Sequence, residues 1–161
     1  MKKALVISGG GSRGAFAGGV AQYLINNENK EYDIFVGTST GSLMVSHLAL
    51  GKLEDLKKLY TNVNQKTIFS NNPFKIKNID GEKVISIRHL NTLWNFLNGR
   101  KTFGESKNLR SLIKKNITKE MYHEIRANNK EVVVTVSNLT KNQIEYKSIK
   151  DCNYGDFCDW I

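Results

Sequence analysis

The sequence predicts an α/β fold in which a mainly parallel β-sheet is covered by helices on both faces. Two short apolar runs, residues 4–7 and 34–36, each lead into glycines and then into a helical pattern of apolar residues. A third run, residues 132–136, consists of valine and threonine, as expected for a strand that is buried on both faces. Strands that alternate with helices in this way favour a parallel sheet, because the helices form the crossover connections.

The first strand and the two helices nearest to it are defined by apolar spacing. Residues 4–7 read Ala-Leu-Val-Ile, and residues 15–26 place Phe16, Val20 and Leu24 at four-residue spacing on one helix face. After the second strand, residues 42–50 are apolar almost all round, which is typical of a buried helix. Gly51 can then end this helix as a C-cap.

The later elements follow from weaker patterns. Amphipathic spacing predicts further helices over residues 53–63, 85–98 and 109–117. Alternation over residues 144–149 predicts a half-exposed strand, which residues 138–142 connect to the strand at 132–136 as a hairpin. We expect one domain over residues 1–161, with residues 64–104 as a variable insertion or a lid.

The stretch Gly37, Thr38, Ser39, Thr40 and Gly41 carries the clearest chemical signal. It reads G-x-S-x-G between the second strand and the buried helix, which is the strand–turn–helix context of a nucleophile elbow. Glycine lacks a Cβ atom, so the strand and the helix can approach closely on either side of the serine. Ser39 is therefore the predicted nucleophile, at a helix N-terminus whose partial positive charge favours a developing oxyanion.

A second glycine cluster follows the first strand and would let backbone N–H groups turn toward an anion. One such anion is the pyrophosphate of a dinucleotide, because Gly9, Gly11 and Gly14 spell G-x-G-x-x-G and Asp33 follows about 20 residues later as a ribose-binding acid. The other is the oxyanion of an acyl-transfer intermediate. Asp33 precedes the second strand, whereas a ribose-binding acid normally ends it. Together with the elbow at Ser39, this favours the oxyanion.

The two motifs together resemble the patatin-like phospholipase family. The resemblance rests on GGGSRGA at residues 9–15 and GTSTGS at residues 37–42, in this order and each at a strand end. It implies a three-layer α/β/α sandwich and a lipid acyl hydrolase that uses a serine–aspartate dyad and needs no metal or organic cofactor. By position, Ser39 is the nucleophile, Gly10 and Gly11 offer oxyanion N–H groups, and Arg13 helps to hold the glycine loop.

The aspartate of the family's dyad has no match in this chain. In the family it lies in a D-G-G or D-G-A turn well beyond the strand at 132–136, and the sequence stops at Ile161 inside an apolar run. The Asp80-Gly81 pair precedes that strand and is typical of an ordinary turn. His47 would lie about 12 Å along the helix from Ser39, too far to act as its base. We therefore expect a truncated chain, almost inactive alone, whose catalytic aspartate lies outside it.

Composition limits the class of protein. Hydrophobic residues make up 40% and charged residues 24% of the chain, as in soluble globular proteins. No apolar run reaches the length of a membrane span, and the first strand is not preceded by a signal-peptide pattern. Cys152 and Cys158 lack neighbouring ligands for a metal and are expected to stay reduced, which agrees with a cytoplasmic location.

The net charge of +9 helps to predict which molecules the protein binds. The basic residues are dispersed and accompany no nucleic-acid motif, so we expect no nucleic-acid partner. The lipid or phospholipid substrate is what the family resemblance implies. A basic solvated surface explains the charge most simply, and peripheral contact with anionic membranes is the alternative. The pattern leaves two other functions open: a nucleotide-binding Rossmann-type domain that uses the glycine loop, and a non-catalytic lipid-binding remnant. It does not predict the oligomeric state.

Overall fold

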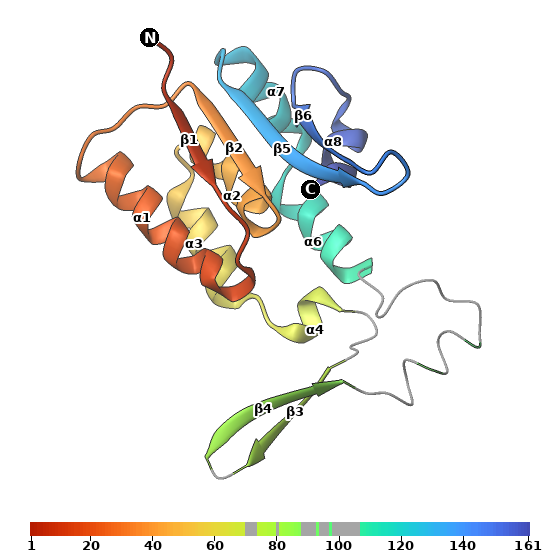
Figure 1. Ribbon diagram of the computed structural model, residues 1–161. Coiled ribbons are helices and arrows are strands. Elements are labelled where there is room, and N and C mark those ends of the chain that lie inside the picture. Colours follow the sequence, from red (N-terminus) through yellow and green to blue (C-terminus); the bar gives the residue numbers. More distant parts are fainter. Residues whose placement is uncertain (70–73, 80, 88–92, 94–96, 98–106) are drawn as a thin grey trace. The chain divides into compact units, whose positions relative to one another are not determined.

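The computed structural model of this chain describes residues 1–69, 74–79, 81–87, 93, 97 and 107–161 (Figure 1). The chain forms two compact units. We call Met1–Asn62 with Ile113–Ile161 the sheet unit, and Val63–Leu112 the hairpin unit. The predicted insertion, residues 64–104, falls within the hairpin unit.

The sheet unit is built on a four-stranded sheet with the order β1-β2-β5-β6. Its first three strands run parallel, and β6 pairs antiparallel with β5. The strands are β1 Ala4–Ile7, β2 Ile34–Thr38, β5 Glu131–Asn138 and β6 Gln143–Ser148. The predicted α/β class, the mainly parallel sheet and the hairpin after residue 138 are therefore confirmed.

Besides one short helix in the hairpin unit, the described residues form six α-helices, which lie between or after the strands of this sheet along the chain (Figure 1). They are α1 Gly14–Asn26, α2 Thr40–Ala49, α3 Leu53–Asn62, α6 Lys107–Asn116, α7 Lys119–Ala127 and α8 Tyr154–Trp160, and a short 3-10 turn, η1 Gly11–Arg13, precedes α1. The four helices predicted over 15–26, 42–50, 53–63 and 109–117 appear within two residues of the expected ends. The sequence prediction omitted α7, although the Thr118 hydroxyl caps it by accepting a hydrogen bond from Met121 N–H.

The core lies between α2 and one face of the sheet. Phe35 and Val134 on that face, and Met44 and Val45 on α2, are each at most 2% exposed. Helices α1, α3 and α7 pack around α2. The opposite sheet face stays exposed at Val6, Ile144 and Tyr146, so the second helical layer of the expected sandwich is not among the described helices of this unit.

The hairpin unit contains a short helix, α4 Gln65–Ile68, and an antiparallel pair of strands, β3 Phe74–Ile79 and β4 Glu82–Ile87. The helix predicted over residues 85–98 is wrong at its start, because Ile85 and Ile87 belong to β4. β-Branched side chains favour a strand, and here cross-strand pairing prevailed over helical spacing. Most of residues 88–98 lie outside the described residues, as does Asp80. None of the described helices is long and apolar enough to cross a membrane.

His47 is a buried polar group in this core. It lies on α2 with 3% of its surface exposed, and its Nδ1 atom has no hydrogen-bond partner among the described residues. Burial lowers the pKa of His47 below its ordinary value of 6.5, because the charged imidazolium would lose its hydration. The folded protein therefore holds this histidine in its neutral form.

This burial predicts a pH-dependent stability. Protonation of His47 favours the unfolded state. The stability that the folded protein gains from holding this histidine neutral is therefore complete above pH 6.5 and is lost as the pH falls below that value. Thermal unfolding measured from about pH 7.5 down to about pH 5 should show a fall in Tm that His47→Leu flattens. This pH range lies above the range in which Glu145 affects stability, because hydrogen bonds from Lys147, Asn138 and Gln143 lower the pKa of Glu145 to about 2.

The matched control for this prediction is His123→Leu, because His123 is exposed on α7. The control should keep the pH slope of the parent. An equal slope in the parent and in His47→Leu would contradict the assignment.

Candidate active site

The turn from β2 into α2 holds Ser39 in a strained backbone conformation. Its φ of 53° and ψ of −121° lie in a region that non-glycine residues rarely adopt, at a cost of about 1–3 kcal/mol. Two hydrogen bonds fix the turn: Ser42 N–H donates to the Ser39 carbonyl at 2.9 Å, and Ser42 Oγ donates to the Gly37 carbonyl at 3.0 Å. The G-x-S-x-G stretch therefore forms a tight strand–turn–helix connection, which is the backbone geometry that an elbow requires.

Both glycines of this elbow are required by close backbone contacts. A Cβ atom on Gly41 would lie 2.3 Å from the carbonyl oxygen of Ile7, at the end of β1. A Cβ atom on Gly37 would lie 2.6 Å from the backbone of Gly41. The first turn of α2 is thus pressed against the ends of two strands, which aims Ser39 outward from the sheet.

The glycine loop after β1 lies directly beside Ser39. A Cβ atom on Gly9 would lie 2.7 Å from Ser39 Cβ and 3.3 Å from Ser39 Oγ. β1 and β2 are parallel neighbours, so their carboxyl ends meet at the same edge of the sheet. The structure therefore brings together the two motifs that lie about 30 residues apart in the sequence.

Thr40 connects the elbow to the glycine loop. Its Oγ1 accepts a hydrogen bond from Gly10 N–H at 3.2 Å, while the Gly10 carbonyl accepts one from Arg13 N–H at 3.1 Å. Gly10 N–H is thus already bonded to the elbow, and the N–H of Thr40 is adjacent to Ser39 in the chain. Thr40 begins α2, and the first N–H groups of a helix have no intrahelical acceptor. The Arg13 side chain is exposed, whereas Gly14 is buried.

Two further residues support the elbow and were missed by sequence reasoning. Thr135 on β5 donates from its hydroxyl to Thr38 Oγ1 at 2.6 Å, which ties the neighbouring strand to the end of β2. Tyr60 on α3 donates from its hydroxyl to the Thr40 carbonyl at 2.9 Å. Burial raises the pKa of Tyr60 to about 12, so it remains a donor at neutral pH. The strand register could have suggested Thr135, but no sequence signal marks Tyr60.

A general base is not seen next to Ser39 in the described part of the chain. Neither a carboxylate nor an imidazole among those residues hydrogen-bonds to Ser39 Oγ. His47 is enclosed in the core two turns along α2, as expected from its spacing. Asp80 lies outside the described residues. The same residues contain no group of three or more His, Cys, Asp or Glu side chains that could hold a metal ion.

Asp33 lies at the other end of β2 from the glycine loop. Its Oδ2 accepts a hydrogen bond from Lys3 N–H at 2.8 Å, beside the start of β1. A ribose-binding acid must lie at the carboxyl edge of the sheet, where the glycine loop is. This position argues against the dinucleotide interpretation of the glycine cluster.

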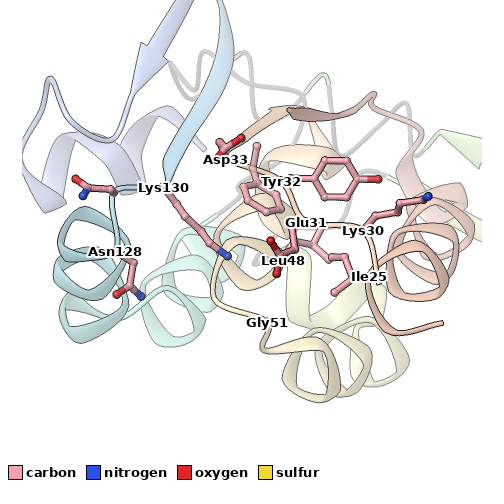
Figure 2. Close-up of a pocket in the computed structure, with 11 residues that line it drawn as sticks. Ile25, Lys30, Glu31, Tyr32, Asp33, Leu48, Gly51, Asn128 and Lys130 are labelled. Carbon is pink, nitrogen blue, oxygen red and sulfur yellow. The ribbon is translucent and has the colours of Figure 1, made fainter. Parts of the chain in front are cut away.

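A cavity of about 370 Å³ opens at this amino edge of the sheet. Phe35 and Leu48 form part of its wall, with Lys30 and Glu31 beside them. Figure 2 shows Lys130 reaching in from the start of β5, and its Nζ lies 5.6 Å from the centre of the Phe35 ring. None of its described lining residues is a serine, threonine or cysteine, so this cavity is separate from the site around Ser39.

Comparison with known proteins agrees with this geometry. A family model for patatin-like phospholipases matches residues 5–161, which is nearly the whole chain. The match includes both the glycine loop and the elbow. Neither the curated proteins nor the solved structures gave a match.

The contact between Gly9 and Ser39 predicts that the loop tolerates no side chain at this position. Gly9→Ala would bring a Cβ atom to 2.7 Å from Ser39 Cβ and force the loop or the serine to move. A misplacement of about 1 Å can cost about 10²-fold in rate, so we expect fluorophosphonate labelling of the complete protein to slow by at least about tenfold.

The matched control is Gly19→Ala on α1, where a Cβ atom would meet nothing within 4 Å. It should label like the parent, with stability raised by about 0.5–1 kcal/mol because alanine favours a helix. Labelling of Gly9→Ala at the parental rate would show that the loop does not approach Ser39 as described.

Proposed function

Because the chain belongs to the patatin-like phospholipase family, whose members are lipid acyl hydrolases, we propose that Ser39 is the nucleophile that hydrolyses carboxylic esters of lipids or phospholipids. The observation that carries the proposal is the position of the strained Ser39 beside the glycine loop. A serine at a strand end, next to several backbone N–H groups, has what acyl transfer requires. The same site explains why both motifs are present.

The reaction proceeds in two steps. Ser39 Oγ attacks the ester carbonyl carbon and gives its proton to a base, which forms a tetrahedral intermediate with a negative oxygen. The intermediate collapses, the alcohol leaves with that proton, and the acyl group remains on Ser39. Water, deprotonated by the same base, then releases the fatty acid and restores the serine.

The oxyanion is stabilised by backbone N–H groups. We assign this role to Thr40, the residue after the nucleophile, and to the glycine loop, with Gly11 as its donor in the conformation described. Gly10 N–H is bonded to Thr40 Oγ1 in this conformation and would have to exchange that partner to take part. Thr40 is accordingly proposed as a positioning residue, because its hydroxyl holds the loop against the elbow.

The base in this proposal is an aspartate, as in the serine–aspartate dyad of the family. None of the described carboxylates forms a hydrogen bond with Ser39 Oγ, so we place the dyad aspartate outside the described residues. No histidine is required, which agrees with the burial of His47 in the core. We also propose that the protein acts in the cytoplasm at the surface of membranes, where its lipid substrates are.

Covalent labelling tests the nucleophile and separates a hydrolase from a non-catalytic lipid-binding protein. In the complete protein, a fluorophosphonate probe should form its adduct on Ser39, as located by mass spectrometry of the peptide. Ser39→Ala should abolish labelling and lower ester turnover by about 10⁴-fold or more. Ser12→Ala, an exposed serine of the same glycine loop, serves as the control and should label normally. An adduct on Ser8, Ser12 or Ser42 would rule out Ser39.

The hydrogen bond between Thr40 and Gly10 predicts a kinetic signature. Thr40→Val removes the acceptor of Gly10 N–H, which releases the glycine loop from the elbow, and should lower kcat by about 10²-fold, the cost of a misplacement of about 1 Å, with KM nearly unchanged. Thr40→Ser keeps the hydroxyl and should restore most of the activity. The assay is hydrolysis of a short-chain p-nitrophenyl ester by the complete protein. Equal kcat values for the valine and serine variants would contradict the positioning role.

A further inference from the structure

The β3–β4 hairpin has one aliphatic face. Side chains alternate between the two faces of a strand, and directly paired residues share a face. Ile76 is paired with Ile85, and Ile87 lies two positions further along the same face of β4. Lys75 is paired with Ser86, and Lys77 with Val84, on the other face. The hairpin therefore carries Ile76, Ile85 and Ile87 on one face, whereas its other face mixes Lys75 and Lys77 with Val84, Ile79 and Glu82.

The aliphatic face is exposed. Ile76 is 46% exposed, Ile85 64% and Ile87 38%. Ile79 at the tip of the hairpin is 50% exposed but lies on the other face, because it pairs with Glu82. A hairpin of two strands is only marginally stable in water unless its apolar face is covered. Ile76, Ile85 and Ile87 therefore form a surface, here called the isoleucine surface, on which a partner would stabilise the fold.

The residues that precede and follow this surface in the sequence carry most of the net positive charge of the chain. The hairpin unit has nine Lys and Arg against three Asp and Glu, so 9 − 3 gives +6 of the total of +9. Within the hairpin, Lys75 and Lys77 stand on either side of Ile76 in β3. An aliphatic surface bordered by lysines matches an interface in which hydrocarbon and negative charge occur together.

We propose that the β3–β4 hairpin docks the protein on anionic lipid membranes. The isoleucine surface enters the boundary between acyl chains and headgroups, and Lys75 and Lys77 extend their long side chains to lipid phosphates. The proposal deepens the function proposed above by naming the surface that contacts lipid, and it rests on that function for its biological meaning. Binding itself requires no hydrolysis.

The positive charge of the hairpin unit also favours one kind of binding partner for this surface over others. A second copy of the chain would bring a unit of charge +6 against another of the same sign, which opposes self-association. Nucleic acid would satisfy the lysines but leave the isoleucines without a partner, since bases are bound by stacking and hydrogen bonding. An anionic lipid surface satisfies both kinds of side chain.

Vesicle co-sedimentation of this chain tests the proposal. Vesicles of equimolar phosphatidylglycerol and phosphatidylcholine should bind the protein, and vesicles of phosphatidylcholine alone should bind it much less. Ile85→Asp should weaken binding by about tenfold or more, because a charge replaces buried hydrocarbon. Lys75→Gln with Lys77→Gln should weaken binding by about 25-fold, since each lysine near an anionic surface contributes about fivefold.

Two matched controls localise the effect. Leu139→Asp introduces the same charge at a residue of the sheet unit that is 90% exposed. Lys57→Gln with Lys58→Gln removes the same net charge from α3. Both controls should bind vesicles almost like the parent. An equal loss in the controls would show that binding follows total charge and would overturn the proposal.

The remaining outcomes also decide the question. A lower Tm for Ile85→Asp without vesicles would show that the isoleucine surface packs inside the protein, which excludes docking. Ile85→Trp provides a second readout, because its fluorescence should shift to the blue on anionic vesicles and stay unchanged if the surface does not enter lipid. Tighter binding to single-stranded RNA than to vesicles would likewise overturn the proposal.

This test is independent of the hydrolase assignment. Ser39→Ala should bind vesicles like the parent, and in the complete protein Ile85→Asp should be labelled by the fluorophosphonate probe at the parental rate. If labelling fails while docking is observed, the hydrolase proposal fails alone. If docking fails while Ser39 is labelled, only the isoleucine surface is excluded.

Discussion

The position of Ser39 depends on the close packing of the first turn of α2 against the ends of β1 and β2. At Gly41 there is no room for even one carbon atom beside the Ile7 carbonyl. The strain at Ser39 costs about 1–3 kcal/mol, whereas full burial of an apolar side chain contributes about 1.5–3 kcal/mol. α2 buries Met44, Val45 and Leu48 to at most 2% exposure. Packing of the helix therefore exceeds the strain and holds the serine in its unusual conformation.

The same helix turn organises the glycine loop. Thr40 follows Ser39 in the chain and accepts the hydrogen bond of Gly10 N–H, so a movement of the turn at Ser39 also moves the loop. Tyr60 and Thr135 hold the turn from α3 and β5. The proposed nucleophile and the proposed oxyanion donors therefore share one rigid support. Such preorganisation is what stabilisation of a developing charge requires.

The two units differ in charge and in surface chemistry. The sheet unit has 15 Lys and Arg against 12 Asp and Glu, a net charge of +3, and it contains both motifs of the candidate site. The hairpin unit has a net charge of +6 and the isoleucine surface. The proposed chemistry and the proposed lipid contact therefore lie in different segments of the chain. A protein arranged in this way can change its membrane affinity without altering the residues around Ser39.

The sequence by itself determined what depends on local chemistry. Apolar runs followed by glycines predicted β1, β2 and the turns after them, and the spacing around Ser39 predicted the elbow. Only the tertiary structure decided features that depend on pairing between distant segments. The strand identity of Ile85 follows from its partner Ile76 across the hairpin, although its spacing in the chain also suits a helix. Likewise, the hydrogen bond from Gly10 to Thr40 exists because parallel pairing brings the ends of β1 and β2 together. No local pattern encodes such contacts, since they depend on strand register and on the packing of α2.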